Sequence, residues 1–359
     1  GVLKLKDDEY ADYEWYSSMS VTVTVTDQGG LSYAETFTIS VNDIAYATPY
    51  ISDITPQYKL YLLPFLHPSG DITIDSLLLG FTYDLDSNPN TPLTITYSLI
   101  RTDSMFDSQY GDEVDELGDE FTDRIVNGSA AWEALVDQAF AYWGQVSGIN
   151  FVKVVETSTQ CGDIRIGLQS EWAIEDEDDS YLAGFSCAGD WDDPGLGSMS
   201  GDVWCHVNND PITLDNVDLT APSTLVHEIG HSLGLAHPFS GITAPTWMDT
   251  AAYTIMSYSG AARVINDWDI DGDGINEYSA GDVIELQKPA IYDIEAIQYI
   301  YGMTPDFNEG DNTYTYEGVV YASIYDTGGI DTIDLSFYSD DFEKDIRLDL
   351  RGGEVSEIG

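Results

Sequence analysis

Alternating apolar and polar residues predict two strands near the beginning of the chain. The run SVTVTVT at residues 20–26 and the run YAETFTISV at residues 33–41 are separated by an Asp-Gln-Gly-Gly turn. Strict period-two alternation on both sides of a short glycine-containing turn predicts a β-hairpin. A complete β-sandwich needs about 100 residues, so residues 1–45 are expected to be only part of a β-module.

The hydrophobic pattern changes after residue 71 and predicts a mixture of helix and strands. Apolar residues spaced three and four apart lie between Ser129, which can cap a helix, and Gly148, which can end one. Runs at residues 93–100, 150–155, 163–168 and 202–207 predict strands. We therefore expect an α+β fold with a helix packed on a twisted mixed sheet. Residues 46–70 contain four prolines and are expected to be a linker.

The composition is that of a folding chain with a large negative charge. The 359 residues include 12 Lys and Arg and 64 Asp and Glu, for a formal charge of −52, and 43% are apolar. This charge repels phosphate, so nucleic acid is not an expected partner, and no apolar run is long enough for membrane insertion. The carboxylates fit a solvated surface for salty surroundings, Ca²⁺ sites, or an acidic face that excludes some substrates. The first two explanations are compatible, and we expect a secreted, extracellular monomer. The sequence does not open on a signal peptide, which a secreted protein would be expected to have lost already.

The three cysteines lack the C-x-x-C spacing of a zinc or redox site. One disulfide and one free thiol is the simplest arrangement of Cys161, Cys187 and Cys205. A Cys187–Cys205 bridge is preferred because it would close the loop between them, but the sequence does not fix the pairing.

Three of the five histidines lie within eleven residues, at positions 227, 231 and 237. On a helix, His227 and His231 lie one turn apart on one face, and Gly234 allows a sharp turn that returns His237. Three such nitrogens can bind Zn²⁺ at about 2.0–2.1 Å and leave one position for water, as in catalytic sites. Glu228 can accept the proton of that water, whose pKa zinc lowers to about 7.

Two alternatives remain for the histidines. The cluster could be a closed structural zinc site, although that would leave Glu228 without a role. We expect His67 to be a surface or packing residue and His206 to be a rim residue rather than a further ligand.

The motif H-E-x-x-H-x-x-G-x-x-H resembles the zinc motif of the metzincins, and T-I-M-S-Y at residues 254–258 resembles the Met-turn of their serralysin group. The resemblance implies a zinc metalloendopeptidase that cleaves polypeptides. It also implies that Met256 is an apolar floor below the ligands. Tyr258 would be a further zinc ligand at rest that later stabilises the oxyanion. Weaker matches are T-Y-S at residues 96–98, G-D-V-W at 201–204 and D-I-E-A-I-Q at 293–298.

The resemblance also implies a domain organisation. Residues 71–303 would be the metzincin catalytic domain, and residues 304–359 would begin a truncated serralysin-like C-terminal β domain. Residues 1–45 resemble the last strands of a cadherin-type repeat. In metzincins the edge strand over the cleft pairs with an extended substrate, and residues 202–207 are expected to be that strand. Cys205 and His206 depart there from the serralysin pattern.

Two acidic segments are candidate Ca²⁺ sites. Carboxylates alternate around Gly272 as in a calcium loop, although Tyr278 occupies the twelfth position where an EF-hand has Glu, and a solvated acidic loop is the alternative. The candidate ligands are Asp267, Asp269, Asp271, Asp273 and Glu277. In the second segment, Asp326, Gly328 and Asp331 match calcium ligands of the serralysin C-terminal domain by resemblance. The glycine-rich nonapeptide repeats that would follow are absent from the sequence.

Two other functions compete with a protease. A calcium-dependent adhesion or matrix-binding module would use the cadherin-like segment and the acidic loops, and would bind without turnover. A zinc hydrolase acting on compounds other than peptides would share the histidines, and only the cleft-edge strand argues for peptides.

Overall fold

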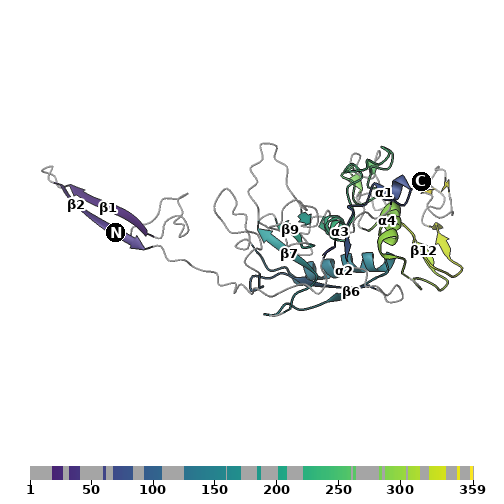
Figure 1. The fold of residues 1–359 in the computed structure, drawn as a ribbon, viewed down its shortest axis with the longest axis horizontal. Coiled ribbons are helices and arrows are strands. Elements are labelled where there is room, and N and C mark those ends of the chain that lie inside the picture. Colours follow the sequence, from purple (N-terminus) through teal and green to yellow (C-terminus); the bar gives the residue numbers. More distant parts are fainter. Residues whose placement is uncertain are drawn as a thin grey trace. The chain divides into compact units, whose positions relative to one another are not determined.

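The computed structural model describes residues 18–26, 32–40, 60–61, 68–83, 93–106, 125–158, 160–170, 184–186, 201–207, 221–259, 262–263, 283–284, 288–304, 306–315, 323–336, 346–347 and 356–358. The chain divides into two compact units, Gly1–Pro49 and Tyr50–Gly359. In the first unit, β1 (Ser18–Thr26) and β2 (Ser32–Ser40) pair antiparallel, so the predicted hairpin is confirmed (Figure 1). A cadherin-like module remains a prediction.

A five-stranded mixed sheet is the main sheet of the second unit. Its order is β6 (Ile149–Lys153), β5 (Leu93–Leu99), β7 (Ile164–Ser170), β9 (Val203–Val207) and β8 (Gly184–Ser186). The first four strands are parallel and β8 is antiparallel to β9, which confirms the predicted mixed sheet.

The prediction for residues 202–207 is wrong in one respect. β9 lies inside the sheet between β7 and β8, so the edge on this side is the short strand β8. Because β8 pairs with β9 from Gly184 to Ser186, the backbone of β9 bonds a strand on both sides. Three residues are too few for an alternation pattern to reveal a strand.

The long helix forms where the pattern predicted it. α2 (Ala130–Val146) begins with the Ser129 hydroxyl accepting the N–H of Trp132 at 3.2 Å. Its apolar side packs on the sheet, where the rings of Phe140 and Tyr97 stack at 3.9 Å. The indole Nε1 of Trp143 donates to the carbonyl of Val226 at 3.0 Å. This bond joins α2 to α3 (Ala221–Ser232), which also lies against β8 and β9 (Figure 1).

Two more helices and four strand pairs complete the described structure. α4 (Ile291–Tyr301) follows the Met-turn and contacts the short α1 (Ile72–Asp75). None of the helices in the described ranges is long and apolar enough to cross a membrane. The pairs are β3 (Leu60–Tyr61) with β4 (Thr82–Tyr83), β10 (Ala262–Arg263) with β11 (Val283–Ile284), β12 (Thr313–Thr315) with β13 (Thr332–Asp334), and β14 (Ile346–Arg347) with β15 (Glu357–Ile358).

Gly234 makes the turn after α3 possible. Its φ is +100°, and a Cβ atom at this position would lie 2.4 Å from the carbonyl oxygen of Phe81. The carbonyl of Gly234 accepts the N–H of Leu79 at 2.9 Å, so the turn is bonded to a neighbouring segment and has little room to shift. A side chain here therefore meets both backbone strain and a backbone clash.

We expect Gly234→Ala to lower the free energy of unfolding by about 3 kcal/mol or more. Gly241→Ala is the matched control, because Gly241 also has a positive φ, +61°, but has open space around its Cβ position. It should cost only about 1 kcal/mol. Urea unfolding of both variants measures the difference, and equal losses would show that the approach to Phe81 is not the cause.

Candidate metal centre

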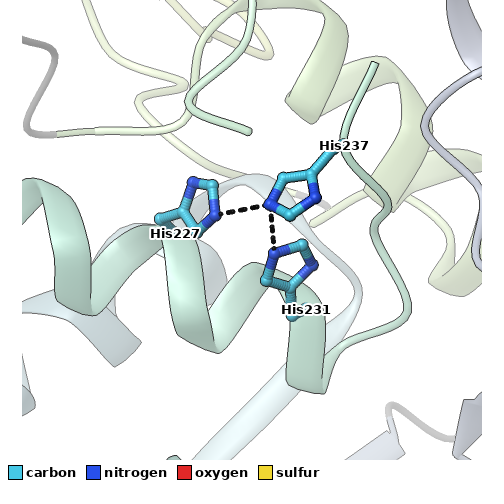
Figure 2. Close-up of side chains that lie close together, drawn as sticks. All are labelled: His227, His231 and His237. Carbon is cyan, nitrogen blue, oxygen red and sulfur yellow. Dashed lines mark hydrogen bonds between the residues drawn. The ribbon is translucent and has the colours of Figure 1, made fainter. Parts of the chain in front are cut away.

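Three imidazoles from a helix and the loop that follows it converge on one point. His227 and His231 lie on successive turns of α3, and the turn at Gly234 brings His237 back toward them (Figure 2). The Nε2 atom of His237 lies 3.2 Å from Nε2 of His227 and 3.0 Å from Nε2 of His231. Among the residues that the structure describes, this is the one group of three or more His, Cys, Asp or Glu side chains that could hold a metal ion.

Backbone carbonyls fix two of the three rings. Nδ1 of His227 lies 2.8 Å from the carbonyl oxygen of Ile255, and Nδ1 of His231 lies 2.8 Å from that of Leu235. A carbonyl only accepts, so each Nδ1 must carry the proton and donate it. Both Nε2 atoms therefore present lone pairs to the centre of the cluster.

The surroundings keep these histidines neutral. Burial, together with the neighbouring imidazoles, lowers the pKa of His231 to about 3 and that of His237 to about 4. Burial also lowers the pKa of His227 below its ordinary value. Neutral imidazole is the form that binds a metal, so no proton competes for these sites near neutral pH.

The donor set fits zinc. Two nitrogens bound to one tetrahedral Zn²⁺ at about 2.0–2.1 Å lie about 3.3–3.4 Å apart, close to the spacings of 3.0 and 3.2 Å found here. With the protons of His227 and His231 held on Nδ1, at most one N–H can lie among the three Nε2 atoms. A cation bound by all three nitrogens would remove the repulsion between their lone pairs.

Met256 packs against α3, the helix that carries His227 and His231. Its side chain is fully buried, and a Cβ at Gly230 would lie 2.8 Å from its Sδ and 3.1 Å from the ring of Trp143. Gly230 is one of the three residues of α3 between His227 and His231, and it directly precedes His231. The missing side chain at Gly230 therefore lets the sulfur pack against the helix at the level of the ligands.

A buried carboxylate, Asp293, holds the Met-turn in place. It is fully buried in the first turn of α4 and accepts the hydroxyl of Thr254 at 2.6 Å and the N–H groups of Ile255 and Ala290, each at 2.7 Å. The carbonyl of the same Ile255 receives Nδ1–H of His227. In the sequence, Asp293 is part of only a weak motif match. Its hydrogen-bond partner Ile255 is 38 residues away, so no local sequence pattern predicts this contact.

The ring of Tyr258 lies beside two of the histidines, and Glu228 is the residue that follows His227 on α3. Glu228 is buried on α3. Partial burial of Tyr258 raises the pKa of its phenol, and the charge of Glu228 raises it further. Tyr258 is 72% exposed as a residue, and its ring centroid lies 5.6 Å from that of His227 and 4.5 Å from that of His237. The aromatic ring of Phe239 also lies here, stacked on His237 at 4.9 Å, and no motif predicted it.

Two of the predicted calcium ligands in the described residues, Asp326 and Asp331, accept hydrogen bonds from neighbouring residues. Asp326 accepts the hydroxyl of Tyr314 and the N–H of Gly328, whereas Asp331 accepts the N–H of Asn312 at 2.9 Å. These bonds stabilise the loops that lead into β12 and β13. The acidic segment from residue 267 to residue 277 lies outside the described residues, as do His67 and the side chain of His206.

The preferred disulfide pairing is wrong. Cys205 has a free, buried thiol, and burial raises its pKa, with a further contribution from the charge of Glu228. In the register of β8 and β9, the residue opposite Cys205 is Gly184. Cys187 itself lies outside the described residues, and Cys161 also has a free thiol.

The part of the chain that contains this site is similar to known proteins. Residues 121–255 match the matrixin family model. Serralysin A of Dickeya chrysanthemi is 33% identical over 184 residues, which are 46% of this chain and 35% of that protein. The metallopeptidase AprA of Pseudomonas marginalis is 31% identical over 192 residues, 46% of this chain and 38% of that protein. The chain thus spans little more than a third of the length of these relatives. Within that span, the part of the chain that holds the three histidines is similar to the serralysins and matches the matrixin family model, in agreement with the resemblance of its motifs.

Proposed function

We propose that this protein is a secreted, zinc-dependent endopeptidase. The observation that carries the proposal is the convergence of three neutral Nε2 atoms beside the buried Glu228, in a region similar to serralysins. The residues that would hold the metal are His227, His231 and His237. When bound, zinc supplies Lewis acidity, which lowers the pKa of water and polarises a carbonyl group.

Two side chains would perform the proton transfer and the charge stabilisation. Glu228 would accept the proton of the attacking water and deliver it to the leaving amine. Tyr258 would donate a hydrogen bond to the oxygen that becomes negative on attack. Partial burial and the charge of Glu228 raise the pKa of Tyr258, so its phenol keeps the proton that such a donor needs.

Polypeptides are the proposed substrates. β8 (Gly184–Ser186) is antiparallel at the edge of the main sheet and lies against α3, the helix of the histidines. The unpaired side of an edge strand can bond the main chain of an extended peptide, which makes binding tolerant of sequence. The proposed location of strand addition is therefore β8 rather than β9.

The function is tested by incubating the full chain with an unfolded protein library and reading the cut sites by mass spectrometry. We expect cleavage that stops with a zinc-selective chelator and returns when zinc is added, because the ligands remain neutral and available. Zinc-dependent hydrolysis of other compounds without peptide cleavage would favour a different hydrolase. Binding without any turnover would favour the adhesion module, which gives the histidines no role.

A calcium-selective chelator provides the control. We propose Ca²⁺ as a second, structural ion at the acidic segments around Asp267 and Asp326, supported by their oxygen-rich sequences. Its removal should lower the thermal midpoint without removing zinc. An unchanged midpoint would leave zinc as the only ion in the proposal.

A further inference from the structure

The ring of His237 is held differently from those of the other two histidines. Nδ1 of His227 and Nδ1 of His231 each donate to a backbone carbonyl at 2.8 Å. Within the described part of the chain, His237 has no such carbonyl partner, and its ring contacts are with other rings. His237 also lies beyond the end of α3, so helix geometry does not orient it.

Phe239 covers one face of this imidazole. The two rings are 4.9 Å apart between centroids and only 9° from parallel. Tyr258 contacts both rings, at 4.5 Å from His237 and 5.3 Å from Phe239, with tilted planes. Centroid distances of about 4.5–7 Å with offset or tilted planes are the favourable geometry for aromatic pairs. The plane of His237 is thus set by its aromatic neighbours.

The local backbone presents Phe239 to His237. The intervening Pro238 restricts φ, and its carbonyl accepts the N–H of Ala244 at 2.7 Å. The N–H of Ser240 donates to the carbonyl of His237 at 3.0 Å, and Gly241 turns the chain with φ of +61°. This closed turn holds the phenyl ring in place although 43% of that residue remains exposed.

We propose that Phe239 is a positioning residue for His237. Its stacked ring orients the third imidazole toward the metal, the task that backbone carbonyls perform for the other two. The inference rests on the zinc site of the proposed function, but concerns metal binding rather than turnover.

Asp249 is the rival for this role. Its charge acts on His237 through space and opposes the lowering of the pKa of that histidine, while its Oδ1 accepts the hydroxyl of Ser257 at 2.6 Å. Replacement of Asp249 by Asn removes the charge but leaves the stacked pair intact. If Phe239 orients His237, substitution of Phe239 should weaken zinc binding; if Asp249 does, Asp249→Asn should weaken it.

Zinc affinity of the full chain, measured by competition with a chromophoric chelator, tests the proposal. We expect Phe239→Ala to weaken binding about tenfold, the lower end of the range for residues that orient metal ligands. Phe239→Tyr should retain the zinc affinity of the unaltered chain. Phe239→Leu keeps apolar volume but has no flat ring, so its zinc affinity should fall nearly as much as that of Phe239→Ala. The control is Ile242→Ala, an apolar residue of the same turn that is 51% exposed, and it should bind normally.

The visible absorption of the Co²⁺-loaded protein gives a second readout, because it responds to ligand geometry. It should change in Phe239→Ala and be restored in Phe239→Tyr. Equal affinities of Phe239→Ala and Ile242→Ala, full affinity of Phe239→Leu, or a larger loss in Asp249→Asn would each overturn the proposal. Normal zinc binding without peptide cleavage would contradict the protease function alone, whereas failure of the unaltered chain to bind zinc would overturn both.

Discussion

Glu228→Gln should lower kcat for peptide cleavage by about 10²- to 10⁴-fold, the usual contribution of a general base. Gln has nearly the same shape as Glu but cannot accept the proton of the attacking water. Glu228 is not one of the three residues of the metal centre, so zinc affinity should remain close to that of the unaltered chain. Steady-state kinetics on a cleavable peptide and zinc competition on the same preparation measure both effects.

Glu295→Gln is the matched control for this substitution. Glu295 lies on α4, where burial and the charge of Asp71 raise its pKa. The change of carboxylate to amide is the same, but kcat should be unaffected. A Glu228→Gln variant that turned over within tenfold of the unaltered chain would remove Glu228 from the proposed role.

Asp293→Ala should have the second large effect, on stability and on zinc affinity together. Removal of the carboxylate leaves the hydroxyl of Thr254 and the N–H groups of Ile255 and Ala290 buried without their acceptor. An unsatisfied buried donor costs about 1–3 kcal/mol, so we expect a loss of about 3 kcal/mol or more in the free energy of unfolding. The loosened Ile255 carbonyl should also weaken the hold on His227. Urea unfolding and zinc competition measure the two losses.

Asp293→Asn separates the charge from the hydrogen bonds. Burial raises the pKa of Asp293 to about 6, against the lowering effect of its three hydrogen bonds. Between about pH 4 and pH 6 the folded state then binds more protons than the unfolded state, so stability falls as pH rises through this window. The fall should be about 3 kcal/mol at most and should be missing in Asp293→Asn. Parallel pH profiles for the two proteins would contradict the raised pKa.

The local parts of this molecule could be predicted from sequence, whereas contacts between distant segments could not. The spacing of His227, His231 and His237 is set by helix periodicity and one glycine, and the structure brings these residues together. α2 was predicted for the same reason, because its apolar residues repeat over seventeen positions. The roles of Asp293 and Phe239 depend on which chain segments meet in space.

The errors have a similar origin. β8 contains three residues, too few for a pattern, and its pairing with β9 made the predicted edge strand an inner strand. The proposed bridge at Cys205 was wrong, and the residue opposite Cys205 is set by sheet register, which the sequence does not reveal.

The hydrogen bonds that hold His227 and His231 differ in how early they can form during synthesis of the chain. His231 bonds the carbonyl of Leu235, four residues later, whereas His227 bonds that of Ile255, twenty-eight residues later. A nascent chain that has emerged only as far as His237 carries all three rings, but lacks the partner that fixes His227. Tight metal binding would therefore require the Met-turn and the first turn of α4, so the proposed metal centre would be complete only after translation has passed well beyond its three ligands.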